Sequence, residues 1–288
     1  MRIVFVIDAG KYEWQSVLLA ASARLYASGC TGLTACVPGP RRTLISESVL
    51  AHHVAQGVEI VEIGDVADHF SPRYDHGNKI LAAAAMAGRG SALFMDSDTV
   101  FVKDTHLPDL LDGRTLSGAR ATGPAWPITD PAAWHRAHSA AGLPPADPIH
   151  LNAGVIAWSA ELELGPRWLD IARAIDASGL KNLRPWLDQV ALGTLAASLP
   201  TGSVNRLDKT YNYSIVHDPN RVPIVPHILH YHGGNRLQKL RRSLGPRAVN
   251  HILRGLPVFG DIDALARLAD ETDARHHALK SNDQINQV

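Results

Sequence analysis

The chain has 288 residues, of which 45% are hydrophobic and 19% are charged, a composition ordinary for a globular protein with a substantial buried core. Lysine plus arginine and aspartate plus glutamate both number 28, so the formal net charge is zero. This balance argues against a dedicated nucleic-acid binder, which would carry an excess of basic residues.

The sequence indicates a protein of a reducing, cytoplasmic compartment. The short apolar run at residues 3–7 stops at Asp8 without a small-residue cleavage site, so we expect a first strand and not a signal peptide. No apolar segment approaches the length of a transmembrane span. Cys30 and Cys36 are the only cysteines, and we expect both to be unpaired thiols.

Strand and helix patterns alternate over the first hundred residues. Strands are predicted at 3–7, 33–37, 58–63 and 92–95, and helices at 14–25, 43–56 and 77–87. This alternation predicts an α/β fold, in which helices cover both faces of a largely parallel sheet. Ligands bind such sheets beyond the carboxyl ends of the strands, where Asp8 and residues 96–98 are expected.

The second half of the chain departs from this alternation. Strands are predicted at 116–120, 150–158, 204–207 and 224–232, helices around 168–175, from 185, from about 236 and at 262–279, and loops at 121–131 and 143–148. The histidine pairs at 52/53, 135/138 and 276/277 have no neighbouring carboxylate or cysteine pattern, and we expect them to be exposed.

Asp96 and Asp98 follow directly on the apolar strand at 92–95. Because alternate residues of a strand face the same side, the two carboxylates can converge while Ser97 turns away. Adjacent carboxylates repel each other unless they share a proton or a cation, so one interpretation is a divalent metal bound jointly with substrate phosphates. Asp-Ser-Asp is also a common turn composition, and an acidic turn explains the motif alone equally well.

Five further segments accompany the carboxylate pair. They are Asn78-Lys79, Asn152-Ala153-Gly154, Asp188-Gln189 in the first turn of a helix, Tyr211-Asn212-Tyr213 and His230-Tyr231-His232-Gly233. Together and in this order they resemble glycosyltransferase family 8, over about residues 1–245. The Asp-x-Asp, Asn-Ala-Gly-Val, Asp-Gln and His-x-x-Gly motifs carry this resemblance, which implies the GT-A nucleotide-diphospho-sugar transferase fold with a Rossmann-like mixed sheet.

The resemblance implies a manganese (or magnesium) ion held by Asp96, Asp98 and His230, with His232 as the alternative ligand on the same strand face. Two carboxylates and one imidazole are a chemically reasonable set for such an ion. It further implies transfer of a sugar from a UDP-sugar, with retention and metal-assisted departure of UDP. The acceptor, which could be a glycan, a lipid-linked sugar or a small molecule, is not specified.

Roles for the remaining site residues also come from the resemblance. Asp188 and Gln189 are expected to be catalytic and to lie near the donor sugar. The substrate-binding residues are expected to be Asp8, Tyr12, Lys79, Asn152, Ala153, Gly154, Gly233 and Arg236. Arg236 stands where the family has the lysine of a Lys-Pro-Trp segment, which this chain lacks.

We expect one GT-A-like catalytic domain at 1–250, with a nucleotide-binding half at about 1–105 and an acceptor half at about 106–250. A helical tail at 251–288 follows, with a disordered end. The basic stretch 236–247 could contact a membrane surface peripherally.

Two alternatives belong to other functional classes. Asp96 and Asp98 also fit the motif of haloacid-dehalogenase-type phosphatases, in which Asp96 would be the nucleophile and Asp98 the general acid/base. The phosphatase motif normally follows the first strand of its domain, whereas three strand–helix units precede it here. The other alternative is a catalytically silent sugar-nucleotide-binding module.

Overall fold

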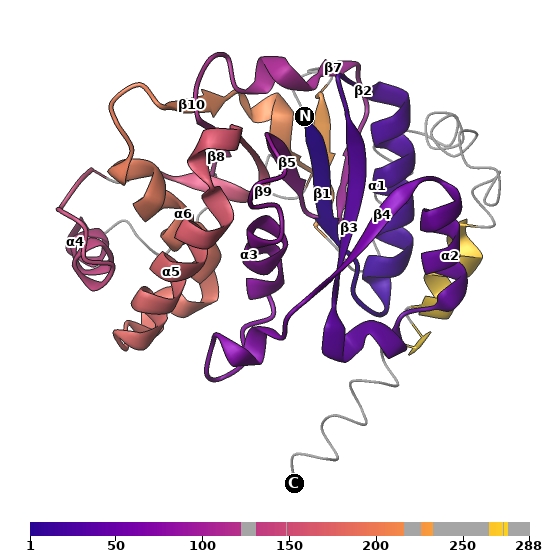
Figure 1. Ribbon diagram of the computed structural model, residues 1–288, viewed down its shortest axis with the longest axis horizontal. Coiled ribbons are helices and arrows are strands. Elements are labelled where there is room, and N and C mark those ends of the chain that lie inside the picture. The colour runs from indigo at the N-terminus through magenta and orange to yellow at the C-terminus, as the bar shows by residue number, and fades with distance from the viewer. Residues whose placement is uncertain (122–130, 148, 216–225, 233–264, 273, 276–288) are drawn as a thin grey trace, which may run out of the picture.

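A computed structural model of the chain describes residues 1–121, 131–147, 149–215, 226–232, 265–272 and 274–275 (Figure 1). A seven-stranded sheet forms its centre, in the order β10-β8-β9-β5-β1-β3-β4. The strands are β1 (Arg2–Val6), β3 (Gly32–Pro38), β4 (Val58–Ile63), β5 (Ala92–Met95), β8 (Leu116–Arg120), β9 (Leu151–Trp158) and β10 (Val204–Leu207). Within this sheet β9 runs antiparallel to both of its neighbours, and the other pairs are parallel.

Helices cover both faces of this mixed sheet, as the alternation predicted. They are α1 (Lys11–Tyr26), α2 (Glu47–Ala55), α3 (Gly77–Ala84), α4 (Pro131–Ala140), α5 (Leu164–Ala177) and α6 (Leu187–Ser198). Val4 and Phe94 pack in the core beneath α3, α5 and α6. Their neighbours Ile3 and Leu93 pack on the opposite face, which α1 and α2 cover (Figure 1). Alternating side chains of the buried strands therefore contribute to two cores.

The direction in which successive strands are added to the sheet reverses between β1 and β5. After β1 the chain adds β3 and β4 on one side and then returns through α3 to place β5 on the other side of β1. In α/β sheets ligands typically bind beyond the carboxyl ends of the strands at such a switch point. Ser97 crosses this point, where its buried hydroxyl donates a hydrogen bond to the Val6 carbonyl.

A second, three-stranded sheet continues from this edge. It contains β6 (Thr99–Phe101), β11 (Tyr213–Ser214) and β12 (Ile228–His230), in the order β11-β12-β6. β12 pairs antiparallel with β6, so that His230 lies opposite Thr99. The pairing brings residues that are far apart in the sequence next to Asp98. A two-stranded pairing of β2 (Ala27–Ser28) with β7 (Thr105–His106) lies elsewhere.

Short 3-10 helices account for several differences from the predicted elements. They are η1 (Gly39–Leu44), η2 (Val66–Asp68), η3 (Leu107–Leu110), η4 (Ala160–Leu162), η5 (Lys181–Trp186) and η6 (Lys209–Asn212). The helix predicted at 43–56 begins only at Glu47, because Ile45 is extended and separates it from η1. The helix predicted from Pro185 begins at Leu187, and Pro185 lies inside η5.

Other differences concern elements that carry weak sequence signals. α4 was not predicted, although Ala133, Trp134 and Ala137 recur at helical spacing and are buried. The late strand predicted at 224–232 is limited to Ile228–His230 within the described residues. The basic helix predicted from about 236 lies outside them.

The expectation of exposed histidine pairs was partly wrong. His52 and His53 are buried, and His53 hydrogen-bonds the Ser16 hydroxyl at 2.9 Å. His138 is also buried, whereas His135 is exposed and residues 276–277 lie outside the described part. These histidines lie on the inner faces of α2 and α4, so the helical spacing and not the polarity of the side chain decides their burial.

Part of the predicted C-terminal tail packs on the body of the protein. Residues 265–272 are helical, and Leu265 and Leu268 join a buried cluster with Trp14 and Tyr231. Among the described helices, none is both long and apolar enough to cross a membrane.

Candidate active site

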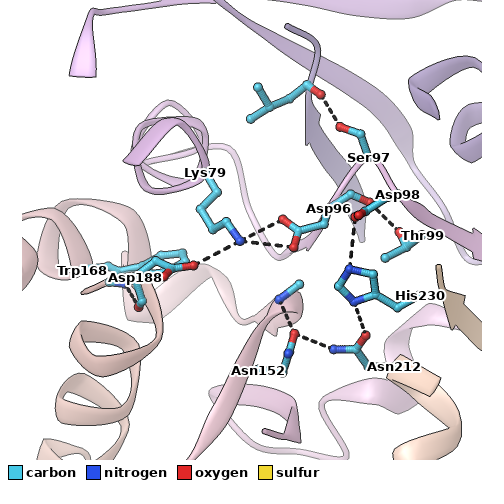
Figure 2. A network of polar contacts seen from close by, with 12 residues as sticks. Lys79, Asp96, Ser97, Asp98, Thr99, Asn152, Trp168, Asp188, Asn212 and His230 are labelled. Carbon is cyan, nitrogen blue, oxygen red and sulfur yellow. Dashed lines mark hydrogen bonds and ion pairs between the residues drawn. The ribbon is translucent and has the colours of Figure 1, made fainter. Parts of the chain in front are cut away.

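Two carboxylates and one imidazole converge where β5 ends. Ligand atoms of Asp96, Asp98 and His230 all lie within 4.8 Å of one another (Figure 2). The turn that presents the carboxylates is fixed by Thr99, whose backbone N–H and hydroxyl both donate to the Asp96 carbonyl, at 3.0 and 2.7 Å. Ser97 points away toward Val6 as predicted, although residues 96–98 form a turn between β5 and β6 and do not continue the strand.

His230 reaches this point because β12 pairs with β6. Its Nε2 atom lies 3.1 Å from Oδ1 of Asp98. Burial alone would raise the pKa of Asp98, but the His230 imidazole outweighs burial and holds that pKa well below its usual range. Burial opposes the charged imidazole, yet the neighbouring Asp98 raises the pKa of His230 above its ordinary value.

Gly154, in β9, allows the side chains of this cluster to pack directly against the backbone. A Cβ atom at this position would lie 2.8 Å from the His230 ring, 2.8 Å from Oδ1 of Asn152 and 3.0 Å from Oδ2 of Asp96. Gly154 and Asn152 therefore face the cluster. The side chain of Ala153 packs in the core on the other face of β9, so the predicted substrate contact of Ala153 is not made by its side chain.

A row of side-chain hydrogen bonds joins β9 to the histidine. Oδ1 of Asn152 accepts the backbone N–H of Gly154 at 2.8 Å and Nδ2–H of Asn212 at 2.7 Å. The Oδ1 atom of Asn212 lies 2.9 Å from Nδ1 of His230. Figure 2 shows this row of side chains, with His230 next to Asp98, Asn212 next to His230, and Asn152 next to Asn212.

Lys79 connects the carboxylate pair to a third carboxylate. Its Nζ atom lies 3.0 Å from Oδ1 of Asp96 and 3.1 Å from Oδ2 of Asp188 (Figure 2). Burial disfavours the charged ammonium, but Asp96 and Asp188 outweigh it and raise the pKa of Lys79 above its ordinary value. The side chain comes from the first turn of α3, where Gly77 allows close packing, since a Cβ there would lie 2.8 Å from the Phe70 ring.

Asp188 lies in the first turn of α6 and is almost fully buried. Its Oδ1 atom accepts a hydrogen bond from the Tyr74 hydroxyl at 2.8 Å, and its backbone carbonyl accepts the Trp168 indole N–H at 2.9 Å. Burial would raise the pKa of Asp188, but the Lys79 ammonium lowers it below its ordinary value. Gln189 beside it is half-buried.

Asp8 and Tyr12 lie at the carboxyl end of β1. Asp8 accepts hydrogen bonds from the Ala9 backbone at 2.7 Å and from Nε of Arg41 at 2.6 Å. Burial, and after it the charges of Asp98 and Asp8, raise the pKa of the Tyr12 phenol to about 12. Tyr12 is therefore a neutral phenol beside the carboxylates.

The alternative metal ligand, His232, lies next to His230 without joining the cluster. The two rings stack with centroids 3.9 Å apart, and Nε2 of His232 lies 2.7 Å from the Ser214 hydroxyl. Gly233 and Arg236, both predicted to bind substrate, lie outside the described residues.

Three residues at this site were not assigned by the sequence. Asn212 belongs to a segment that the resemblance singled out, but nothing in the sequence indicated a partner for it. Tyr74 and Arg41 lie in connecting segments and reach Asp188 and Asp8 through folding alone. A tyrosine or arginine without a spacing pattern gives no signal in a single sequence.

Comparison with known proteins places this site in a glycosyltransferase. A family model described as the Rhodobacterales glycosyltransferase domain matches residues 3–199. Among curated proteins, no sequence matches the chain.

Several solved glycosyltransferases have a similar structure. An active-site mutant of LgtC superposes with a TM-score of 0.54 at 15% identity, covering 84% of this chain and 96% of LgtC. Mouse xyloside xylosyltransferase 1 gives 0.50 at 15% identity, covering 81% of this chain and 97% of that chain. The bifunctional glycosyltransferase WbbM gives 0.50 at 14% identity, covering 89% of this chain and 49% of that chain.

At these identities the structural likeness establishes the fold, and it confirms the GT-A architecture predicted from the sequence. The family model spans more than half of the chain and includes Asp96, Asp98, Asn152 and Asp188. The chain therefore belongs to the Rhodobacterales glycosyltransferase domain family and is a glycosyltransferase with the GT-A fold.

Proposed function

We propose that this glycosyltransferase transfers a sugar from a UDP-sugar to a glycan, lipid-linked or small-molecule acceptor, with retention and in the manner of glycosyltransferase family 8. A divalent metal, manganese or magnesium, would assist the departure of UDP. The observation that carries the proposal is the convergence of Asp96, Asp98 and His230 at the switch point of the sheet. Ligand sites of α/β sheets occur at this place.

The residues present fit a divalent metal. Two carboxylates and an imidazole suit such an ion, and Gly154 lets them converge, since any Cβ there would overlap His230 and crowd Asp96. When bound there, the metal would supply positive charge to the diphosphate, on which negative charge develops as UDP leaves.

The other residues suit donor binding. Lys79 offers ammonium protons within the same site, and Asp188 presents a carboxylate whose position Tyr74 and Lys79 hold. Asp188 can accept a hydrogen bond from a sugar hydroxyl, and its ionised form can stabilise positive charge near the anomeric carbon. We assign Gln189 to the same sugar site, and Asp8 and Tyr12 to the nucleoside.

Some parts of the proposal concern residues beyond those described. Gly233 stays a predicted substrate-binding residue, Arg236 stays a predicted diphosphate ligand, and the basic stretch 236–247 stays a predicted membrane contact. A cytoplasmic location also stays a prediction.

The phosphatase hypothesis finds no support. The matched family is a glycosyltransferase domain, and the carboxylate of Asp96, which would have to attack phosphorus, is paired with Lys79. Only a measurement of turnover distinguishes the enzyme from a catalytically silent sugar-nucleotide-binding module.

The test is release of UDP from a panel of UDP-sugars by the purified protein with manganese. We expect release from at least one donor, loss of release with a chelator, and loss in Asp98→Asn. Asp109→Asn, which changes an exposed carboxylate outside the site, is the matched control and should retain activity. Absence of release from every donor, together with no metal-dependent thermal stabilisation by UDP, would refute the proposal. UDP binding without turnover would favour the silent module.

A further inference from the structure

We propose that Asn212 is a positioning residue that, in the neutral His230 ring, places the proton on Nδ1 and so leaves the lone pair on Nε2, the atom that faces Asp98. The inference rests on the proposed function in that Nε2 would be the metal-binding atom. It adds a residue to that site and explains which nitrogen of which histidine binds.

The first step concerns Asn152. A backbone N–H can only donate a hydrogen bond, and the N–H of Gly154 points to a side-chain atom of Asn152 at 2.8 Å. That atom must therefore be the carbonyl oxygen Oδ1 and not the amide nitrogen. The backbone of β9 thus fixes the orientation of the Asn152 amide.

In the second step, the orientation of the Asn152 amide determines that of the Asn212 amide. Because Oδ1 of Asn152 only accepts, the atom of Asn212 that lies 2.7 Å from it must be the amide nitrogen Nδ2. The oxygen of Asn212 is then on the opposite side, 2.9 Å from Nδ1 of His230. An amide oxygen cannot donate, so Nδ1 of His230 must carry the proton.

The third step concerns the metal-facing atom. A neutral imidazole carries one N–H, so a proton on Nδ1 leaves Nε2 with its lone pair. Nε2 is the atom that lies 3.1 Å from Asp98. Without Asn212, Asp98 would instead favour the tautomer with the proton on Nε2, because a carboxylate accepts hydrogen bonds. In the neutral ring Asn212 therefore acts against the preference of Asp98 and leaves Nε2 as the nitrogen that can bind a cation.

The fold holds this row in place. Asn212 ends η6 directly before β11, and β11 pairs with β12, which carries His230. His232 differs in this respect, because its Nε2 atom lies 2.7 Å from the Ser214 hydroxyl and does not face Asp98 in the way that Nε2 of His230 does. The arrangement thus favours His230 over His232 as the metal ligand. It also leaves Asn152 only its Nδ2 group for contact with a donor sugar.

The tautomer can be measured without metal, donor or turnover. Nitrogen NMR of the full chain labelled in its histidine rings, at a pH where the His230 ring is neutral, distinguishes the two tautomers, and His230→Gln assigns the signal. We expect Nδ1 to be protonated in the wild type and the proton to move toward Nε2 in Asn212→Leu. A wild-type ring protonated on Nε2 would overturn the inference even if Asn212→Leu did not fold.

The second experiment measures the affinity of the protein for manganese alone, by calorimetry. Loss of a partner that orients a ligating histidine typically weakens metal binding by about 10- to 100-fold, and we expect this for Asn212→Leu. Ser214→Ala, which removes the corresponding contact of His232, is the matched control and should leave the affinity unchanged. Equal affinity of the wild type and Asn212→Leu would overturn the inference. If the wild type binds no manganese, the proposed function fails, while the tautomer measurement still decides the role of Asn212.

Discussion

Replacing Lys79 with methionine removes the one ammonium group that lies between Asp96 and Asp188 and keeps most of the aliphatic chain. The Lys79 side chain is only 11% exposed and that of Asp188 only 5%, so water can replace little of the lost interaction. At an effective dielectric constant of about 20, each ion pair near 3 Å has a Coulomb energy of roughly 5 kcal/mol before desolvation is subtracted. Removing one partner of a buried pair typically costs about 3–5 kcal/mol, and we expect a loss of unfolding free energy in this range at neutral pH.

The loss should depend on pH in a direction that the pKa shifts specify. Lys79 lowers the pKa of Asp188 in the folded protein, so the pair contributes stability above the unfolded carboxyl pKa, near 4, and that contribution is lost as the pH falls. In Lys79→Met, burial acts on Asp188 without this opposing charge, so its folded pKa rises. The variant takes up a proton on Asp188 more readily than the wild type, and its deficit should shrink as the pH falls from 7.5 toward 5.

Urea denaturation followed by tryptophan fluorescence, with a chelator present and at both pH values, measures this deficit. Lys103→Met changes an exposed lysine and is the matched control, with an expected effect below about 0.5 kcal/mol. A deficit of Lys79→Met below about 1 kcal/mol, or one of equal size at both pH values, would show that the Lys79 pairs are not the buried interactions described here.

Three further changes have expected outcomes. Gly154→Ala places a Cβ 2.8 Å from the His230 ring, and we expect manganese affinity by calorimetry to fall at least about tenfold while circular dichroism stays unchanged. Tyr74→Phe removes the hydroxyl that donates to Asp188, and we expect urea denaturation at pH 7 to show a loss of about 1.5–3 kcal/mol, the usual value for a hydrogen bond to a charged group. Burial lowers the pKa of His53 to about 3, so the unfolded chain binds its proton first below pH 6.5 and stability falls by up to about 1.4 kcal/mol per pH unit. His53→Gln should have a shallower pH slope than the wild type between pH 6.5 and 5, and an identical slope would contradict the burial of a neutral ring.

The first half of the fold was predictable because its signals are local. Each early strand is a short apolar run, and each helix between them has apolar residues at helical spacing and ends near a glycine. The ends of the elements were less predictable, as between η1 and α2, which are separated by two extended residues, Ile45 and Ser46. α4 was missed because it follows a segment rich in proline and glycine, whose composition predicts a loop.

The site was predictable in its members but not in its contacts. Asp96 and Asp98 are two residues apart in the turn between β5 and β6, and this short spacing in the sequence was sufficient to predict that they lie close together. The contacts of Lys79 with Asp188 and of Asn212 with His230 depend on how α3 meets α6 and on the register of β12 against β6. No short-range pattern encodes such a register, so these contacts become visible only in the folded chain.

The charges at the site follow from these contacts. Asp96, Asp98 and Asp188 carry three negative charges and Lys79 one positive charge, which leaves two negative charges when His230 is neutral. A single divalent cation would balance these two negative charges. A charged His230 would balance only one of them, and its Nε2 atom would carry a proton and could not coordinate a metal. With the His230 ring neutral and its proton on Nδ1, the charge of the site would therefore match one divalent ion. The diphosphate of the proposed donor would then bring negative charge that this balance does not cover, and a further cation at the rim of the site would be needed to offset it.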